Sequence, residues 1–152
     1  MNSKKQTITP LYFETYLAVI KNSLTSRLFR NFYALVNGKK KDLTKNGDLS
    51  CAFFVSFILF HFHQIKAGHV TVESTVADLK KGGWKEIKKP QIGCVIVWKQ
   101  KAFSHGHKHI GFYVGNDKAV SNSHKLGHPI KYHWTFGNQR NIEVILWNPK
   151  FK

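Results

Sequence analysis

The sequence predicts a single α+β domain in which helices come first and an antiparallel sheet follows. Apolar residues in the first third recur at the three- and four-residue spacing of an amphipathic helix. From residue 93 onward the pattern changes to short runs rich in β-branched residues and to strict alternation. A length of 152 residues suits one domain with one core. We therefore divide the domain 1–152 into an N-terminal helical part (1–46), a central part (47–124) and a C-terminal loop and strand (125–152).

Residues 11–36 are predicted to be helical, with Thr9-Pro10 as the start. Gly38 and the lysines that follow it are predicted to form a loop. The helical spacing involves Leu11, Tyr12, Tyr16, Leu17, Ile20, Leu24, Leu28, Phe32 and Leu35.

Residues 51–66 are predicted to form a helix at the centre of the domain, because they are apolar on nearly every side. Asn46-Gly47-Asp48 is typical of a turn, and the side chain of Asp48 or Ser50 could cap the helix. His61 and His63 are two residues apart and point in different directions, so we expect structural roles for both.

The sheet is expected to be an antiparallel meander. The run 93–98 is dense in β-branched residues, and 109–115 places Ile110, Phe112 and Val114 on one face. Gly115-Asn116-Asp117 is a hairpin signal, so the next strand should pair back. The expected elements are a loop or short helix at 70–79 and strands at 93–98, 109–115, 118–123 and 142–147, the last after a loop around 135–141.

The composition limits the possible partners and compartments. With 24 Lys and Arg against 8 acidic residues, the net charge of +16 will attract nucleic acid or other anionic polymers without regard to sequence. No signal peptide is visible, and the apolar run 52–60 is far shorter than a membrane span, so we expect no transmembrane segment. The default location is cytoplasmic, with export to the cell wall by an unrecognised route as the alternative. In the cytoplasm a disulfide between Cys51 and Cys94 is disfavoured, and Cys94 is expected in the core.

Cys51 stands at the start of the central helix. Helix N-termini stabilise a thiolate, and their free N–H groups can hold an oxyanion, so a nucleophile is one interpretation. A buried core cysteine is the other. A catalytic thiol needs a base from another element, and His109 begins a strand with Gly111 two residues on, which leaves room on that face. Cysteine at a helix start with histidine at a strand start is the arrangement of papain-like hydrolases.

A third residue should orient the imidazole from the strand after the hairpin. Ser121 and Asn122 are the candidates, with Ser123 and His124 beyond them. Asn122 is favoured because its amide oxygen can accept the imidazole N–H, although strict alternation turns it to the other face unless a bulge intervenes. Ser121 is the alternative.

Three segments resemble the NlpC-type cell-wall cysteine peptidases. Residues 51–55 look like their C-x-x-F-V helix start, and 92–98 are similar to their Pro-Gly-Asp strand. Residues 109–116 closely resemble their H-V-G-I-Y-x-G-N hairpin. The resemblance covers roughly residues 47–124. The CHAP amidases, with the same order of Cys before His, are the nearest alternative.

The resemblance implies a papain-like α+β fold, in which the Cys-bearing helix packs on the antiparallel meander. It implies amide hydrolysis in peptidoglycan peptides without a cofactor or metal, with 47–124 as catalytic core, Cys51 as nucleophile and His109 as base. The family's third polar residue falls at Ser121. The sequence departs from the family pattern at Ser50, Ala52, Phe53 and Cys94.

Four residues are candidates for substrate binding. Ser50 precedes the cysteine, Tyr113 shares the polar face of the histidine strand, and His107 could line the cleft. Trp134 could border a groove, since aromatic side chains are common in binding sites.

Two other interpretations stay open. His105, His107 and His109 alternate along the chain, and three imidazoles on one side could hold zinc. Alternatively, the domain could keep the fold without the chemistry and bind nucleic acid or wall polymer through its charge.

Overall fold

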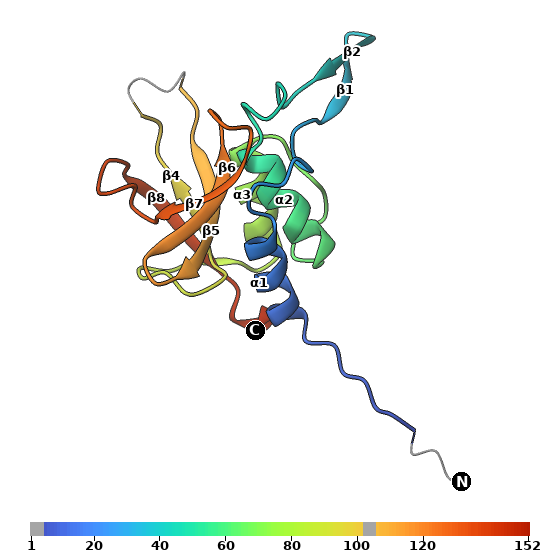
Figure 1. Ribbon diagram of the computed structural model, residues 1–152, viewed down its shortest axis with the longest axis vertical. Helices are drawn as coiled ribbons and strands as arrows, with labels where there is room; N and C mark the ends of the chain where they lie inside the picture. Colours follow the sequence, from blue (N-terminus) through green and yellow to red (C-terminus); the bar gives the residue numbers. More distant parts are fainter. Residues whose placement is uncertain (1–4, 102–105) are drawn as a thin grey trace.

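The computed structural model describes residues 5–101 and 106–152. Figure 1 shows the helices gathered on one side of a sheet, with a small hairpin projecting from the body. The helices are α1 (Tyr12–Asn22), α2 (Cys51–His61), α3 (Val72–Lys81) and the 3-10 turn η1 (Pro149–Phe151). The strands are β1 (Tyr33–Val36), β2 (Lys39–Asp42), β3 (Lys85–Glu86), β4 (Val95–Trp98), β5 (His109–Gly115), β6 (Lys118–Ser123), β7 (His128–His133) and β8 (Ile142–Trp147).

The main sheet has six strands in the order β3-β8-β4-β5-β6-β7, and each neighbouring pair is antiparallel. β1 and β2 form a separate two-stranded sheet. The predicted α+β class is therefore confirmed, and the strands predicted around 93–98, at 109–115, at 118–123 and at 142–147 are present.

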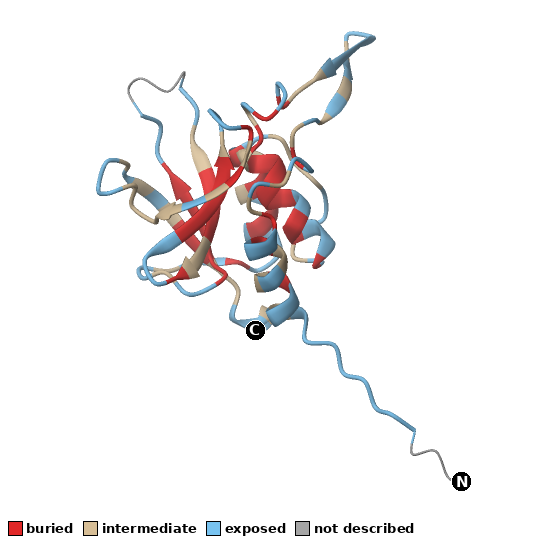
Figure 2. Ribbon diagram, viewed as in Figure 1, coloured by how far each residue is buried: buried red, intermediate tan, exposed pale blue. Residues whose placement is uncertain are grey.

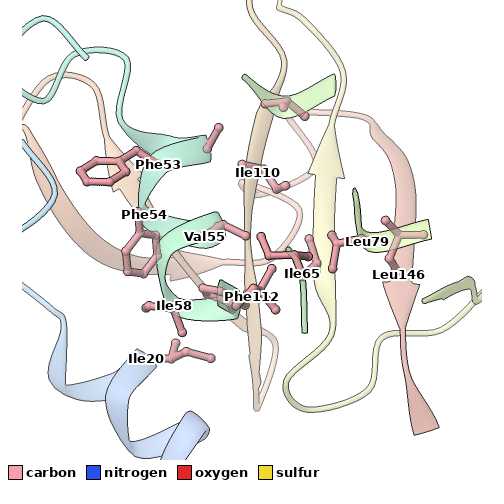
Figure 3. Close-up of a cluster of buried hydrophobic side chains, with 14 of the residues drawn as sticks. Ile20, Phe53, Phe54, Val55, Ile58, Ile65, Leu79, Ile110, Phe112 and Leu146 are labelled. Carbon is pink, nitrogen blue, oxygen red and sulfur yellow. The ribbon is translucent and has the colours of Figure 1, made fainter. Parts of the chain in front are cut away.

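The main core lies between the helices and one face of the sheet. Figure 3 shows Phe54, Val55 and Ile58 of α2 beside Ile110 and Phe112 of β5. α2 contacts the sheet with one face and the other helices and Phe29 with others, while Phe57 and Phe60 remain about half exposed. This packing places Cys51, the first residue of α2, beside the start of β5.

A second, smaller core covers the opposite face of the sheet. It contains Ile96 and Trp98 of β4 and Ala119 of β6, and partly buried aromatic residues from β7 and the loop after it pack against them. The central strand β4 is therefore buried on both faces (Figure 2).

The predicted helix at 11–36 is wrong after Asn22. Thr25 has a positive φ of 65°, and the chain then leads into the β1–β2 hairpin. Leu28 and Leu35 fit the helical spacing but are 80% and 75% exposed. The hairpin closes on Asn37-Gly38, both at positive φ, which is the sequence signal for a tight turn. The lysines predicted as loop form β2.

Of the two alternatives predicted at 70–79, a loop or a short helix, the structure has the helix α3, which is capped by Thr71. Two further regions differ from the prediction. α2 ends at His61 instead of continuing to 66, and His63 lies in the left-handed region with a φ of 57°. β7 was not predicted; it is an edge strand, where Pro129 is tolerated because its missing N–H faces away from the sheet.

Two glycines hold the loop before α2 against the β6–β7 turn. A Cβ on Gly47 would lie 2.7 Å from the Cα of Gly127, and both glycines have positive φ. Arg30 clamps the same turn through hydrogen bonds to the carbonyls of Gly127 and Leu126. This contact sets where α2 begins relative to β6.

Among the described residues, no helix is long and apolar enough to cross a membrane. α2, the most apolar, has 11 residues, which is about 16 Å of helix against a hydrocarbon core of about 30 Å.

Candidate active site

Cys51 is the first residue of α2 and is half-buried. Ser50 occupies the N-cap position, but no side chain caps the helix, so the predicted cap from Ser50 or Asp48 is wrong. The Ser50 hydroxyl is buried without a hydrogen-bond partner in the described part of the chain. Asp48 instead lies 3.5 Å from the Nδ1 of the exposed His124. The amide groups of the first turn of α2 therefore remain without a side-chain acceptor beside the thiol.

His109 is the first residue of β5, and its ring lies among aromatic side chains. The ring centroid is 5.4 Å from that of Trp98 and 5.9 Å from that of Phe136. Its Nε2 lies 2.7 Å from the Ser121 hydroxyl and 3.3 Å from the Tyr132 hydroxyl. Strand alternation explains the contact with Ser121, because both side chains lie on the same face of the neighbouring strands β5 and β6.

The contacts of Ser121 define which ring nitrogen carries the proton. Its hydroxyl donates to the carbonyl of Ile110 at 2.7 Å, and a hydroxyl has one proton to give. Both contacts are satisfied at once when the Ser121 oxygen accepts from His109, and this assignment places the imidazole proton on Nε2. The other nitrogen, Nδ1, is left as the acceptor and forms no hydrogen bond with any described residue, so it is available as a base.

The thiol lies next to the histidine strand. The backbone of Ile110, the residue that follows His109, forms a hydrogen bond with Cys51. Within the described residues, no hydrogen bond joins the thiol to the imidazole itself. Such contacts are often long in free enzymes and shorten when substrate binds.

Burial holds both groups neutral. It raises the pKa of the Cys51 thiol, and the nearby backbone groups and the positive charge of Arg140 offset this only in part. Burial is the largest cause that lowers the pKa of His109 to about 3, and charge repulsion from Arg140, His124 and Lys101 contributes the rest of this shift. The expected stabilisation of a thiolate by the helix N-terminus is thus outweighed, and the resting pair is thiol and neutral imidazole.

Asn122 does not contact His109, so the preference for Asn122 over Ser121 is not supported by the geometry. Its side chain lies on the helix side of β6, where Nδ2 donates to the carbonyl of Gly47 at 2.9 Å. The pairing of β6 with β7 is continuous through residues 121 and 122, so no bulge rotates Asn122 towards the histidine. Ser121 takes the orienting position.

The four candidate substrate-binding residues are scattered. The Tyr113 hydroxyl accepts from the Asp117 amide at the far end of β5, four residues and about 13 Å along the strand from His109. The ring of Trp134 contacts that of Tyr113, while its carbonyl accepts from the Trp98 indole. His107 is exposed two residues before His109, and Ser50 is buried.

His61, His63 and Cys94 lie apart from this site. His105 is outside the described residues, and within the described residues no group of three potential metal ligands gathers. His61 and His63 are exposed at the end of α2. Cys94 is a free, buried residue in the second core, and burial raises its pKa to about 12.

Two residues at the site were missed in the sequence. Tyr132 comes from the unpredicted strand β7, and Arg140 comes from the loop before β8. Alternation along 128–133 could have indicated β7, but nothing in the sequence places Arg140 beside a histidine 31 positions earlier.

Comparison with known proteins adds no relative: no protein-family model matches the sequence, and no curated protein matches it significantly.

Proposed function

We propose that this protein is a cysteine hydrolase that cleaves amide bonds, with a papain-like arrangement of its catalytic groups. The observation that carries the proposal is the fixed tautomer of His109. Ser121 holds the proton on Nε2 and leaves Nδ1 as the acceptor, and Cys51 lies against the backbone of the next residue. The family resemblance of residues 51–55 and 109–116 suggests peptidoglycan peptides as the substrate class.

In the proposed reaction the thiol attacks the amide carbonyl while His109 takes its proton at Nδ1. The Sγ–carbon bond forms, and the oxyanion lies near the uncapped amides of α2. His109 then gives the proton to the leaving amine as the carbon–nitrogen bond breaks. Water hydrolyses the thioester with the same histidine as base. Because both groups are neutral at rest, proton transfer accompanies attack.

The test is hydrolysis of purified peptidoglycan, which is measured by the release of new amino groups. Cys51→Ala should abolish release, whereas Cys94→Ala, which removes the other thiol, should retain it if the variant is folded. In the wild-type protein, iodoacetamide should alkylate Cys51 much faster than Cys94, since Cys94 is fully buried. Equal, slow labelling of both thiols, or full activity of Cys51→Ala, would refute the proposal.

A second candidate is a polyanion-binding protein that keeps the fold without the chemistry. The β1–β2 hairpin favours it, because Lys39, Lys40 and Lys41 are consecutive and exposed where the hairpin projects from the body (Figures 1 and 2). In this case Cys51→Ala would leave binding unchanged.

A further inference from the structure

Arg140 is held rigidly beside the histidine strand. Its Nε donates to the carbonyl of Lys99 at 3.0 Å, and its Nη2 donates to the carbonyl of His107 at 3.2 Å. Its guanidinium also lies over the ring of Phe136, 5.8 Å from the centroid. Two backbone carbonyls and a ring face orient the group, but none of them carries a negative charge.

The surroundings of Arg140 are those of the proposed catalytic pair. The Phe136 ring beneath it packs against His109 and stacks on Tyr132, whose hydroxyl reaches the His109 ring. The carbonyl that it binds belongs to His107, two residues before His109. Its positive charge is also felt at Cys51 and at Tyr132, where it lowers the pKa that burial raises.

The positive charge of Arg140 has no acidic partner among the described residues. Among the described residues no carboxylate forms an ion pair with Arg140, and the four undescribed internal residues, 102–105, include no acid. The charged groups that act on His109 are all cationic. A half-buried guanidinium without a counter-ion is costly unless an anion completes it, and guanidinium groups match carboxylates well.

We propose that Arg140 binds a carboxylate of the substrate next to the bond that Cys51 attacks. The substrate class is then amides with a carboxylate close to the scissile bond, either an acidic side chain or a chain terminus. This inference rests on the proposed hydrolase function.

Alkylation of Cys51 tests the site without a known substrate. Iodoacetate and iodoacetamide perform the same reaction, in which sulfur displaces iodide, but iodoacetate carries a carboxylate. Both reagents react with the thiolate, so the ratio of their rates does not depend on the fraction of Cys51 that is ionised. We divide this ratio by the same ratio for glutathione and expect the result to favour iodoacetate by about 10-fold. Arg140→Gln should remove this preference.

Arg30→Gln is the matched control, since Arg30 also donates to two backbone carbonyls, but these belong to the β6–β7 turn. It should leave the ratio unchanged. An equal loss in Arg30→Gln would assign the preference to net charge and overturn the carboxylate site. If Arg140→Gln does not fold, Arg140→Lys, which keeps the charge, should retain a reduced preference.

The outcomes separate the two proposals. If Cys51 reacts readily with iodoacetamide but the wild-type protein shows no preference for iodoacetate, the carboxylate site is wrong and the nucleophile stands. If neither reagent reacts faster with Cys51 than with Cys94, the hydrolase proposal itself fails. Protection against iodoacetamide by N-acetylglutamic acid α-amide or by N-acetylalanine identifies a side-chain or a terminal carboxylate. If neutral N-acetylalanine amide protects Cys51 as well as these carboxylates do, the carboxylate site is contradicted.

Discussion

Ser121 on β6 forms hydrogen bonds both with the backbone of β5 and with the imidazole of His109. It is fully buried on β6, and its hydroxyl donates to β5 while it accepts from His109. A hydroxyl is a weaker orienting group than a carboxylate, but here its single proton is already used. The ring is therefore held in one tautomer without a charged partner.

Replacing Ser121 by Ala should lower kcat about 5-fold, with KM little changed, because a hydrogen bond of about 1 kcal/mol that orients the base is lost. The measurement is steady-state hydrolysis of peptidoglycan fragments. Asn122→Ala is the control. It removes a buried hydrogen bond to Gly47, so it should lower the free energy of unfolding and leave kcat of the folded protein unchanged. The opposite pattern would restore Asn122 as the orienting residue.

Among the elements, the β5–β6 pair depends on the absence of a side chain at Gly111. A Cβ there would lie 2.7 Å from the Cβ of Ser121 and from the carbonyl oxygen of Val120, and 3.1 Å from the Trp98 ring. The room that the sequence suggested for the histidine is filled by these neighbours. Gly111 thus allows Ser121 to approach β5 closely.

Gly111→Ala should lower the free energy of unfolding by about 2 kcal/mol, since overpacking forces backbone and Ser121 apart. It should also lower activity in the fraction that folds, because Ser121 moves with the strand. Urea denaturation measures the first effect. Gly68→Ala is the control, since nothing lies within 4 Å of its added Cβ. Equal stability of the two variants would contradict the close packing.

The β1–β2 hairpin is held at its base by one carboxylate. Asp42 accepts hydrogen bonds from the Asn31 side chain, from the amides of Phe32, Thr44 and Asn46, and from the Thr44 hydroxyl. Burial alone would raise the pKa of this carboxyl, but the hydrogen bonds outweigh burial and hold the pKa well below its usual value.

A carboxyl whose pKa is lowered in the folded state stabilises that state at pH values above its unfolded pKa of about 3.9. This stabilisation is lost as the pH falls through the folded pKa. The hairpin should therefore lose protection from hydrogen exchange between about pH 5 and pH 2, after correction for intrinsic rates. Asp42→Asn should reduce protection at pH 7 and flatten the pH dependence. Asp48→Asn, outside this set of hydrogen bonds, should do neither. Parallel pH curves for Asp42→Asn and the wild type would contradict the role of the carboxylate.

At the scale of the whole molecule, the net charge of +16 dominates encounters with other molecules. The surface lysines include the exposed run 39–41 on the hairpin. Charge of this size attracts any polyanion and is screened by salt.

Binding to DNA or teichoic acid should therefore weaken steeply between 50 and 200 mM salt, by about 10-fold or more if several lysines make contact. Replacing Lys39, Lys40 and Lys41 by Gln should reduce the salt slope measured by fluorescence anisotropy, and Cys51→Ala should not alter it. A salt-independent affinity would show that binding is not governed by charge.

The sequence by itself determined the α+β class, most strands of the main sheet and the positions of Cys51 and His109 at the starts of α2 and β5. These follow from local patterns: alternation in 109–123, continuous apolarity after Cys51 and turn residues between elements. Helical spacing alone misled at Leu35, because the hairpin that contains it is held by the hydrogen bonds of Asp42, and its side chain stays exposed.

The tertiary structure decided which side chains meet at His109. Ser121, rather than Asn122, reaches the ring because the unbroken pairing of β6 with β7 fixes the face of each residue. Tyr132 lies on β7 and Arg140 lies in the loop before β8. The order of the strands in the sheet brings both segments close to His109. Burial raises the pKa of Cys51, so the cysteine rests as a thiol and not as the expected thiolate. Burial depends on packing from every side, and no local sequence pattern contains that information.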